Sequence, residues 1–545
     1  MKLQTERLQQ ICLSRSRDGS VPVPPTKANS IVRAREKKLF ESSLLASCPR
    51  EKWVKDSYLA GCPYPILMTD RHDRNLRELH EALVLAITNI VERWWTDIDA
   101  KLPQRMPLEP QEEDLLRWIE TLDAGAIRPF QQRLGSWRPD FLIELIPDPQ
   151  APSLTMEQFC ICEINARFCW NGFLHAAYGQ KALIDLGAEQ KGFVGAADCR
   201  VILDGLFNLL DQSLPLHLLK GEEHGMDIYI FAEYAERRTG VRPIFILPED
   251  LRLVPDKNEK SGFKLCCLVR DNRSPPSSRN SRHSNRFVYN GEILEEIYQV
   301  SLELHQRELR ALGPEMLRQL TLRCFNDMRT IFLVHDKRML GIVLQELDAL
   351  VYKHGVLTEE QANALRRGVT TSYLPGSSEL EHFIKHCKEI PKMKDNFLLK
   401  PIRSGKGAGI LFGDQLSAEE WQSRLQALRN PSLVSQQTTY IVQRQIKQLV
   451  FNVLLREREG LQRNYLVGTY HAVNGKYLGI GTWRSGPGRI CAVSHGGAWL
   501  CSVMSRCDHP RFDVTQKRLS FVSPLFFAAV CICLLCCFCP SYRIL

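Results

Sequence analysis

Several patterns that would assign a chain to a common class are missing from this sequence. Its N-terminus has no apolar run of the length that a secretory signal peptide needs, roughly 7–15 residues. Its 19 cysteines show no CxxC…CxxC or CxxC…HxxxH spacing, so we expect no structural zinc site. Cys160, Cys162 and Cys169 are embedded in apolar sequence, where reduced thiols commonly pack. These features favour a cytoplasmic protein with reduced cysteines.

The charge pattern argues against a nucleic-acid partner. Of the 545 residues, 44% are hydrophobic and 24% charged, which is ordinary for a globular protein with a large core. The formal net charge of +9 is unevenly placed, with an excess of basic residues in 1–60 and in Asp256–Arg286. Neither stretch interleaves aromatic residues with its charges, as a nucleic-acid platform would. We interpret both stretches as solvated surface or flexible arms.

The most informative stretch is Asn396–Ile410, with the sequence NFLLKPIRSGKGAGI. A short apolar run that ends in Lys400 and Pro401 predicts a buried strand. The glycines that follow let the backbone turn tightly and bring its N–H groups close to an anion. No Ser or Thr follows the loop lysine, so this is not a Walker A motif. The pattern suits nucleotide phosphates, with a basic turn that binds nothing as the alternative. The residues we assign to it are Lys400, Arg403, Ser404, Gly405, Lys406, Gly407 and Gly409.

A second stretch, Phe159–Gly172, places Glu163 and Asn165 two residues apart after the apolar sequence FCIC. In a strand, residues at this spacing point to the same face. A carboxylate beside an amide oxygen suits Mg²⁺ held next to phosphates. A solvated strand edge is the alternative, but a buried carboxylate is costly without a partner. The apolar context therefore favours a function for Glu163.

Three shorter segments complete the pattern. Phe332–Leu340 places Asp336-Lys337-Arg338 between a strand-like run and a helix-like run. Tyr440–Ile446, with the sequence YIVQRQI, is another short apolar strand that ends in polar side chains. Arg138-Pro139-Asp140 stands in SWRPDFLIE, upstream of the Glu-x-Asn pair.

Together these segments resemble the ATP-grasp superfamily of carboxylate–amine ligases, over roughly Asp70–Met504 of this chain. In the D-alanine–D-alanine ligases an Asp-Lys-x-Arg segment, a Lys-Pro strand with a glycine-rich loop and a hinge strand precede the Glu-x-Asn strand. Here the Glu-x-Asn strand comes first, preceded by Arg-x-Asp. That order is similar to the circularly permuted branch, which includes the synthetase domain of glutathionylspermidine synthetase. One departure is Gln443-Arg444-Gln445, where many of these enzymes have a hinge glutamate.

The resemblance implies an α/β ATP-grasp fold, circularly permuted, with a small Rossmann-like parallel α/β domain. It also implies ATP-dependent ligation of a small-molecule carboxylate to an amine through an acyl phosphate, with ATP and Mg²⁺ as cofactors. A catalytically silent nucleotide-binding or scaffold protein is the alternative. The residues carried over are Lys337 and Lys400 for the phosphates, Gln443, Gln445 and Ile446 for the nucleotide, Asp140, Glu163 and Asn165 for the metal, and Arg138 and Arg484 for the acyl phosphate.

The sequence also suggests a division into domains. Leu76–Asp99 has apolar residues at helical spacing, and residues 201–254 alternate helix-like and strand-like runs, which favours a parallel α/β unit. The expected segments are a basic N-terminal extension (1–70), a metal-binding half of the ATP-grasp core (71–190), a Rossmann-like substrate domain (191–318) with a basic loop (256–286), an ATP-binding half (319–506) and a hydrophobic cysteine-rich tail (507–545).

The tail contains an uncharged apolar run, Phe521–Cys539, that is long enough to span a membrane. Lys517 and Arg518 precede it, as basic residues often precede such spans. A tail anchor, a packed element and a gene-model artefact are all open, and a membrane-anchored protein is therefore the alternative to a cytoplasmic one.

Overall fold

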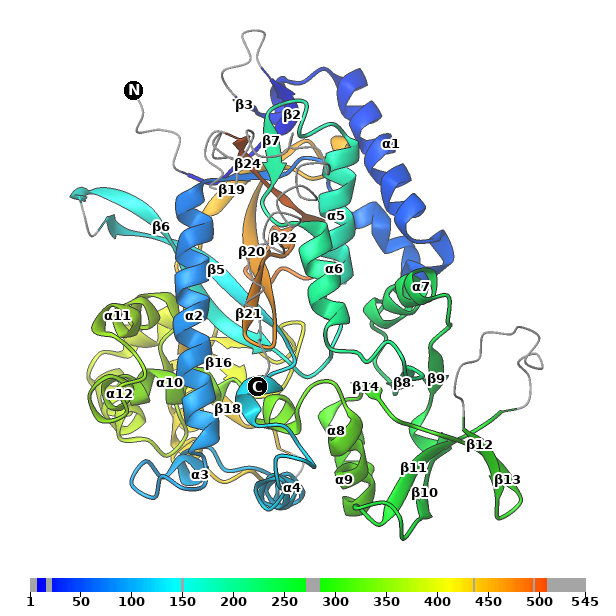
Figure 1. Ribbon diagram of the computed structural model, residues 1–545. Helices are drawn as coiled ribbons and strands as arrows, with labels where there is room; N and C mark the ends of the chain where they lie inside the picture. Colours follow the sequence, from blue (N-terminus) through cyan, green and yellow to red (C-terminus); the bar gives the residue numbers. More distant parts are fainter. Residues whose placement is uncertain are drawn as a thin grey trace, which may run out of the picture.

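The computed structural model describes residues 7–15, 22–148, 151–270, 285–434, 437–493 and 496–506 (Figure 1). The hydrophobic tail 507–545, with Phe521–Cys539, lies outside these residues, and so do residues 271–284 of the second basic stretch. Within the described residues, no helix is both long and apolar enough to cross a bilayer.

Two antiparallel sheets build the centre of the molecule. The larger has seven strands in the order β23-β22-β20-β5-β6, with β19 and β21 also paired to β20. The smaller has four strands in the order β15-β18-β16-β17. The strands of the larger sheet are β5 (Ser136–Asp148), β6 (Ala151–Asn165), β19 (Val450–Leu454), β20 (Leu461–Val473), β21 (Lys476–Ile480), β22 (Trp483–Gly486) and β23 (Ala498–Leu500). Those of the smaller are β15 (Ser372–Tyr373), β16 (Phe397–Pro401), β17 (Leu411–Phe412) and β18 (Tyr440–Arg444).

Helices pack around these sheets. The helix expected over Leu76–Asp99 is present as α2 (Asp70–Glu92), which buries Leu76, Leu83 and Ile87 and contacts β21 (Figure 1). The other described helices near the centre are α3 (Leu102–Arg105), α4 (Pro110–Glu120), α8 (Gln306–Ala311), α9 (Pro314–Arg323), α10 (Arg338–Asp348), α11 (Glu359–Gly368), α12 (Ser378–Glu389) and α13 (Ala418–Ala427).

The N-terminal region is part of the folded body. β1 (Gln9–Gln10) and β4 (Ile66–Met68) join β24 (Ser502–Ser505) and β7 (Phe193–Gly195) in one sheet. α1 (Ser30–Ser47) packs on α5 (Phe173–Asp185), and a short two-stranded sheet pairs β2 (Cys12–Arg15) with β3 (Pro22–Val23). The interpretation as solvated surface or a flexible arm is therefore wrong for the described residues of the stretch 1–60. The reason is that apolar residues scattered among the charges are buried, among them Leu8, Ile11, Leu13, Phe40 and Leu44.

The expected parallel α/β unit is present. β8 (His217–Lys220), β9 (Ile244–Ile246) and β14 (Val300–Glu303) form a parallel sheet in the order β14-β8-β9. α6 (Cys199–Phe207) and α7 (Asp227–Thr239) belong to the same stretch of chain.

A four-stranded antiparallel sheet follows this unit, in the order β10-β11-β13-β12. Its β11 occupies Phe263–Leu268, so the expected basic loop 256–286 is not one loop. The apolar residues Leu265, Cys266 and Cys267 are buried, which is why this part of the basic stretch is a strand. The other strands are β10 (Leu251–Pro255), β12 (Arg286–Tyr289) and β13 (Glu292–Glu296).

Two further expectations concern local structure. Phe332–Val334, expected as a strand, lies in a π-helical turn, Thr330–Val334, that leads into α10. Its residues are all buried, and a short apolar run alone does not distinguish a buried strand from a buried helix. Cys160, Cys162 and Cys169 are buried free thiols, as expected, and burial raises the pKa of each.

Candidate active site

The two sequence pairs Arg-x-Asp and Glu-x-Asn meet on neighbouring strands. In the antiparallel pairing of β5 with β6, Arg138 lies opposite Asn165 and Asp140 lies opposite Glu163. Because side chains alternate along a strand, the four residues share one face of the large sheet. A bulge between Asp140 and Phe141 interrupts the regular pairing just beyond them.

Asp140 is held between two arginines. Its Oδ1 lies 3.1 Å from Arg138 Nε, and its Oδ2 accepts a hydrogen bond from Arg484 of β22. Asp140 is only 2% exposed. Burial alone would lower the pKa of Arg484. The carboxylates of Asp140 and Glu163 have the larger opposite effect, so the pKa of Arg484 is raised above its usual value. Arg484 therefore lies beside Asp140, among the residues that the resemblance singled out.

Glu163 of the larger sheet contacts Lys400 of the smaller sheet. Its Oε2 lies 3.1 Å from Lys400 Nζ and 3.6 Å from Lys337 Nζ. Lys400, at the end of β16, also donates to the backbone oxygen of Cys162 at 3.0 Å. Burial alone would raise the pKa of Glu163, but the two ammonium groups hold it well below its usual range. Asn165 Nδ2 lies 3.5 Å from the other oxygen of Glu163.

Lys337 connects this centre to the glycine-rich loop. Its ammonium donates to the backbone oxygen of Ser404 at 2.6 Å, and its backbone N–H donates to Ile402 O at 3.1 Å. Lys406 of the same loop reaches the parallel α/β unit, where its Nζ lies 3.0 Å from Glu223. Gly407 and Gly409 have φ angles of 75° and 76°, which side-chain-bearing residues rarely adopt.

The hinge strand contributes Gln443 to the same interior. Its Nε2 donates to Cys162 O at 3.4 Å and to Ser372 Oγ at 3.1 Å, so it lies beside Lys400. Ile446 is buried, and Gln445 donates its backbone N–H to Asn396 O at 2.8 Å. Among the described atoms, Gln445 Oε1 is buried without a hydrogen-bond partner.

A buried ionic group was not predicted from the sequence. Asp336 accepts hydrogen bonds from Arg338 at 2.9 and 3.0 Å and from Arg403 at 3.1 Å. Arg403, expected beside the phosphates, also donates to Glu112 of α4 at 2.7 and 3.0 Å, so these two carboxylates bind its guanidinium. Burial opposes ionisation, but the arginines lower the pKa of Asp336 to about 2. This ionic group fixes the turn that carries Lys337. No sequence motif around Glu112 indicated that Glu112 takes part in the group.

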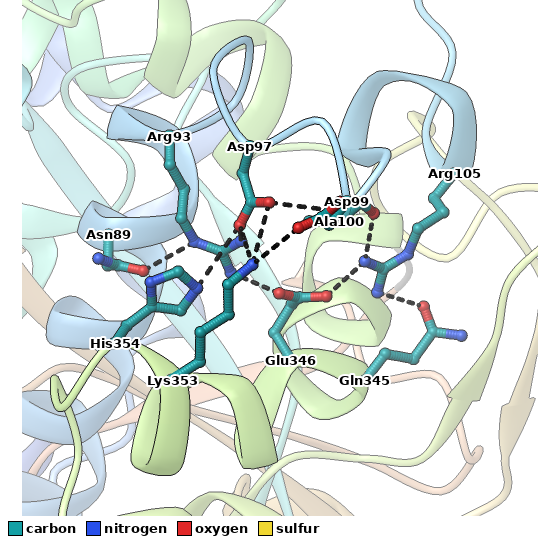
Figure 2. Close-up of polar contacts among 10 residues, drawn as sticks. All are labelled: Asn89, Arg93, Asp97, Asp99, Ala100, Arg105, Gln345, Glu346, Lys353 and His354. Atoms are coloured by element: carbon teal, nitrogen blue, oxygen red, sulfur yellow. Dashed lines mark hydrogen bonds and ion pairs between the residues drawn. The ribbon is translucent and has the colours of Figure 1, made fainter.

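A second ionic group anchors the far end of α10 (Figure 2). Glu346 lies 2.5 Å from Arg93 at the end of α2 and also binds Arg105 of α3. Asp97 accepts from Arg93 at 2.7 Å and lies near Lys353 and His354 (Figure 2). Both ends of α10 are therefore fixed by buried charge, which holds Lys337 at the centre of the site.

The balance of charge at the centre suits a polyanion. Four cationic side chains come together with only two carboxylates, Asp140 and Glu163. The two lysines are buried and the two arginines partly buried, and electrostatic interactions are stronger there than in water. The cations are Arg138, Lys337, Lys400 and Arg484.

Comparison with known proteins identifies relatives of this chain. The AnkG N-terminal domain family matches residues 79–333. The ATP-grasp enzyme ankG of Aspergillus thermomutatus is 36% identical over 509 residues, which cover 92% of this chain and 100% of that enzyme. The chain belongs to the ATP-grasp enzymes. The family and the enzymatic character expected from the sequence are thereby confirmed.

A solved structure shares the mixed α/β fold of this ATP-grasp chain. It is a glutathione synthetase-like effector from Globodera pallida in its apo form, with a TM-score of 0.50. The match covers 88% of this chain and 99% of the effector at 11% sequence identity, so it concerns the fold alone.

Proposed function

We propose that this ATP-grasp chain is a carboxylate–amine ligase. It would transfer the γ-phosphoryl group of ATP to a small-molecule carboxylate and then displace phosphate from the acyl phosphate with an amine, releasing ADP and phosphate. The observation that carries the proposal is the contact of Lys337 and Lys400 with Glu163, which lies opposite Asp140 on the neighbouring strand, in a group with an excess of positive charge. Phosphoryl transfer depends chiefly on such positioned charge.

Each group at the centre has a role in this proposal. Lys400 and Lys337 hold the α- and β-phosphates, and the backbone N–H groups of Ser404–Gly409 close over the phosphates. The planar guanidinium groups of Arg138 and Arg484 face the acyl phosphate, which they can bind in a bidentate manner. Gln443, Gln445 and Ile446 contact the nucleotide.

Asp140, Glu163 and Asn165 would hold Mg²⁺. The donor set fits, because two carboxylates and an amide share one face of β5 and β6 and Mg²⁺ prefers few protein oxygen ligands beside phosphates. When bound, Mg²⁺ neutralises charge on the phosphoryl oxygens. The low pKa of Glu163 keeps its carboxylate ionised at neutral pH, as a metal ligand must be.

We also infer that the ATP-grasp fold is circularly permuted. β5 and β6, with the metal-binding residues, precede β16 and β18, with the nucleotide-binding residues, in the chain. The proposed division is a metal-binding half (71–190), a substrate domain (191–318) and an ATP-binding half (319–506).

Calorimetric titration of ATP, with and without Mg²⁺, tests this proposal. Lys400→Ala is expected to weaken ATP binding by about tenfold or more, since it removes a buried cation from the phosphate site; tenfold corresponds to about 1.4 kcal/mol. Glu163→Gln should abolish the dependence of binding on Mg²⁺. Lys392→Ala, which changes an exposed lysine near the same strand, is the matched control and should bind like the unmodified chain.

Turnover is measured as ADP release with a panel of acids and amines. Release that requires both a carboxylate and an amine supports ligation, whereas tight ATP binding without release from any pair supports the silent alternative. Unchanged ATP affinity and Mg²⁺ dependence in both variants would refute the assigned site.

A further inference from the structure

An ion pair joins the glycine-rich loop to the parallel α/β unit. Lys406 of the loop has its Nζ 3.0 Å from Oε1 of Glu223, which lies three residues beyond β8. The two residues are 183 positions apart in the chain, so the pair connects separate parts of the fold. The sequence pattern assigns Lys406 to the phosphates, yet its ammonium donates to this carboxylate. The parallel unit therefore has a direct hold on the loop.

Glu223 has a fixed position in the fold. It is 8% exposed. The ammonium of Lys220 donates to the backbone oxygen of Glu223 at 2.6 Å and to that of Gly221 at 3.2 Å. The backbone N–H of Gly221 donates to Glu303 O at 3.2 Å, which ties this segment to β14. The second carboxylate oxygen of Glu223 lies 3.3 Å from Nε2 of His305. The segment after β8 thus presents an oriented carboxylate to the loop.

The charge of Glu223 depends on Lys406. Burial alone would raise the pKa of Glu223, but its neighbours, Lys406 foremost, have the larger opposite effect and lower the pKa. If Lys406 turned towards a phosphate, a nearly buried carboxylate would lose its main partner beside a polyanion. An unpaired charge in such a place is costly. The pair is therefore expected to persist when ATP binds.

The same pair stabilises an unfavourable backbone conformation. Lys406 has a φ of 57°, in the left-handed region that residues with a Cβ rarely adopt, and Gly407 follows with a φ of 75°. Such a conformation persists where surrounding contacts hold it. Among the described residues Glu223 is the ion-pair partner of Lys406, whose side chain is otherwise 61% exposed. The turn whose N–H groups are proposed to close over the phosphates is thus held from the parallel unit.

We propose that Glu223 is a positioning residue for the glycine-rich loop, and that through Lys406 it keeps the loop closed over bound ATP. Lys406 then acts as a tether, and its ammonium is not a phosphate ligand. This inference deepens the proposed function and rests on its assignment of the loop to the phosphates. Because the pair must break before the loop opens, it is expected to slow the release of the nucleotide more than its capture.

The release of N-methylanthraniloyl-ATP from the full chain with Mg²⁺, chased with excess ATP and followed by stopped-flow fluorescence, tests the tether. Glu223→Gln is expected to raise the dissociation rate about threefold, as the loss of a partly exposed ion pair would. Lys406→Met should have a similar effect, and the double variant should be no faster than the faster single variant, since either change breaks the pair. Glu222→Gln and Lys392→Met change exposed residues and are the matched controls. The Tm of each variant, measured alongside, should stay close to that of the unmodified chain.

Exchange of the two charges provides a second test. Glu223→Lys combined with Lys406→Glu restores an ion pair of opposite polarity and should recover part of the slow dissociation. A lysine that binds phosphate directly could not be replaced by a glutamate in this way. A dissociation rate that Glu223→Gln leaves unchanged or lowers would overturn the inference, because the carboxylate would then not hold the loop or would compete with ATP for Lys406.

The outcomes separate this inference from the proposed function. Slow release that depends on Glu223, without ADP release from any pair of acid and amine, would support the tether while refuting ligation. ADP release that requires both substrates, with dissociation rates unaffected by Glu223→Gln and Lys406→Met, would support ligation while refuting the tether. If the unmodified chain binds no nucleotide, the assigned nucleotide site and the tether are both refuted.

Discussion

At the scale of single residues, Lys337 depends on the residues on either side of it. Asp336 and Arg338 bind each other and not the phosphate site, and Arg403 joins them from the glycine-rich loop. Asp336 and Arg338 are buried, with Arg338 at 0% exposure, and Arg403 is partly buried. Together with Glu112, which binds Arg403, they form a group whose charges balance, while the side chain of Lys337 is left to point at Glu163. In the motif Asp336-Lys337-Arg338, Lys337 is thus available for binding, and its two neighbours stabilise the turn that carries it.

Asp336→Asn is expected to lower the free energy of unfolding by about 3–5 kcal/mol, because the buried guanidinium of Arg338 loses its carboxylate and that of Arg403 loses one of two. The pKa of Asp336 is about 2, below the unfolded value of about 3.9, so the carboxylate stabilises the fold fully above about pH 5. This contribution is lost as the pH falls toward 2. Chemical denaturation at a series of pH values measures this. The difference in the free energy of unfolding between Asp336→Asn and the unmodified chain should be constant from pH 7 to about pH 4 and should shrink below that.

The exposed Asp395→Asn is the control for this measurement and should change stability little. A difference between Asp336→Asn and the unmodified chain that stays the same down to the lowest pH at which both fold would contradict the assignment of the low pKa.

At the scale of elements, the sequence predicted those parts whose chemistry is local. The strand that ends at Lys400, the glycine-rich loop and the Glu163–Asn165 strand depend on side-chain alternation and on glycine conformations that neighbouring residues specify. The predictions of a strand at Phe332–Val334 and of a loop over Phe263–Leu268 were wrong. Packing against distant parts of the chain determines the structure of both segments. Among ionic partners, Glu112 could not be predicted, since 291 residues separate it from Arg403.

The glycine-rich loop allows a matched pair of substitutions. Gly407 has a φ of 75°, and a Cβ there would meet Ile490 Cγ2 at 2.4 Å, whereas a Cβ on Gly405 meets nothing within 4 Å. Gly407→Ala should therefore cost about 1–2 kcal/mol of backbone strain and weaken ATP binding, by roughly 5–30-fold if the bound loop keeps this conformation. Gly405→Ala keeps its N–H and should bind ATP nearly normally. Calorimetry distinguishes the two, and equal affinities would show that the loop binds phosphate in another conformation.

At the scale of the whole molecule, the ends of the described chain are joined in one sheet. β4 pairs with β24 in parallel and with β1 in antiparallel, so residues 9–10, 66–68 and 502–505 depend on one another. Sequence reasoning missed this arrangement because strand pairing across such distances leaves no local pattern, and two-residue β1 has no periodicity to detect. The same pairing explains why a basic N-terminal stretch belongs to the core of the protein.

Gln10 tests this view of the N-terminus. Its side chain accepts a hydrogen bond from Leu454 N at 2.7 Å and donates to Leu454 O at 3.1 Å and to Tyr64 O at 3.3 Å. Gln10→Ala removes these partners and leaves buried backbone groups unsatisfied, which should lower the free energy of unfolding by about 1–3 kcal/mol. The neighbouring Gln9 is exposed, so Gln9→Ala should change stability by less than about 0.5 kcal/mol.

Urea denaturation of the two variants, followed by the fluorescence of the buried tryptophans, makes this comparison under one set of conditions. If the N-terminal strand were a loosely attached arm, both variants would unfold at the same urea concentration as the unmodified chain. A loss of stability confined to Gln10→Ala instead indicates that β1 and β19 unfold together with the larger sheet. β19 pairs with β20, and β20 pairs with β5 of the sheet that carries Arg138, Asp140 and Glu163. The stability of the proposed active site would then depend on a residue more than 120 positions earlier in the chain.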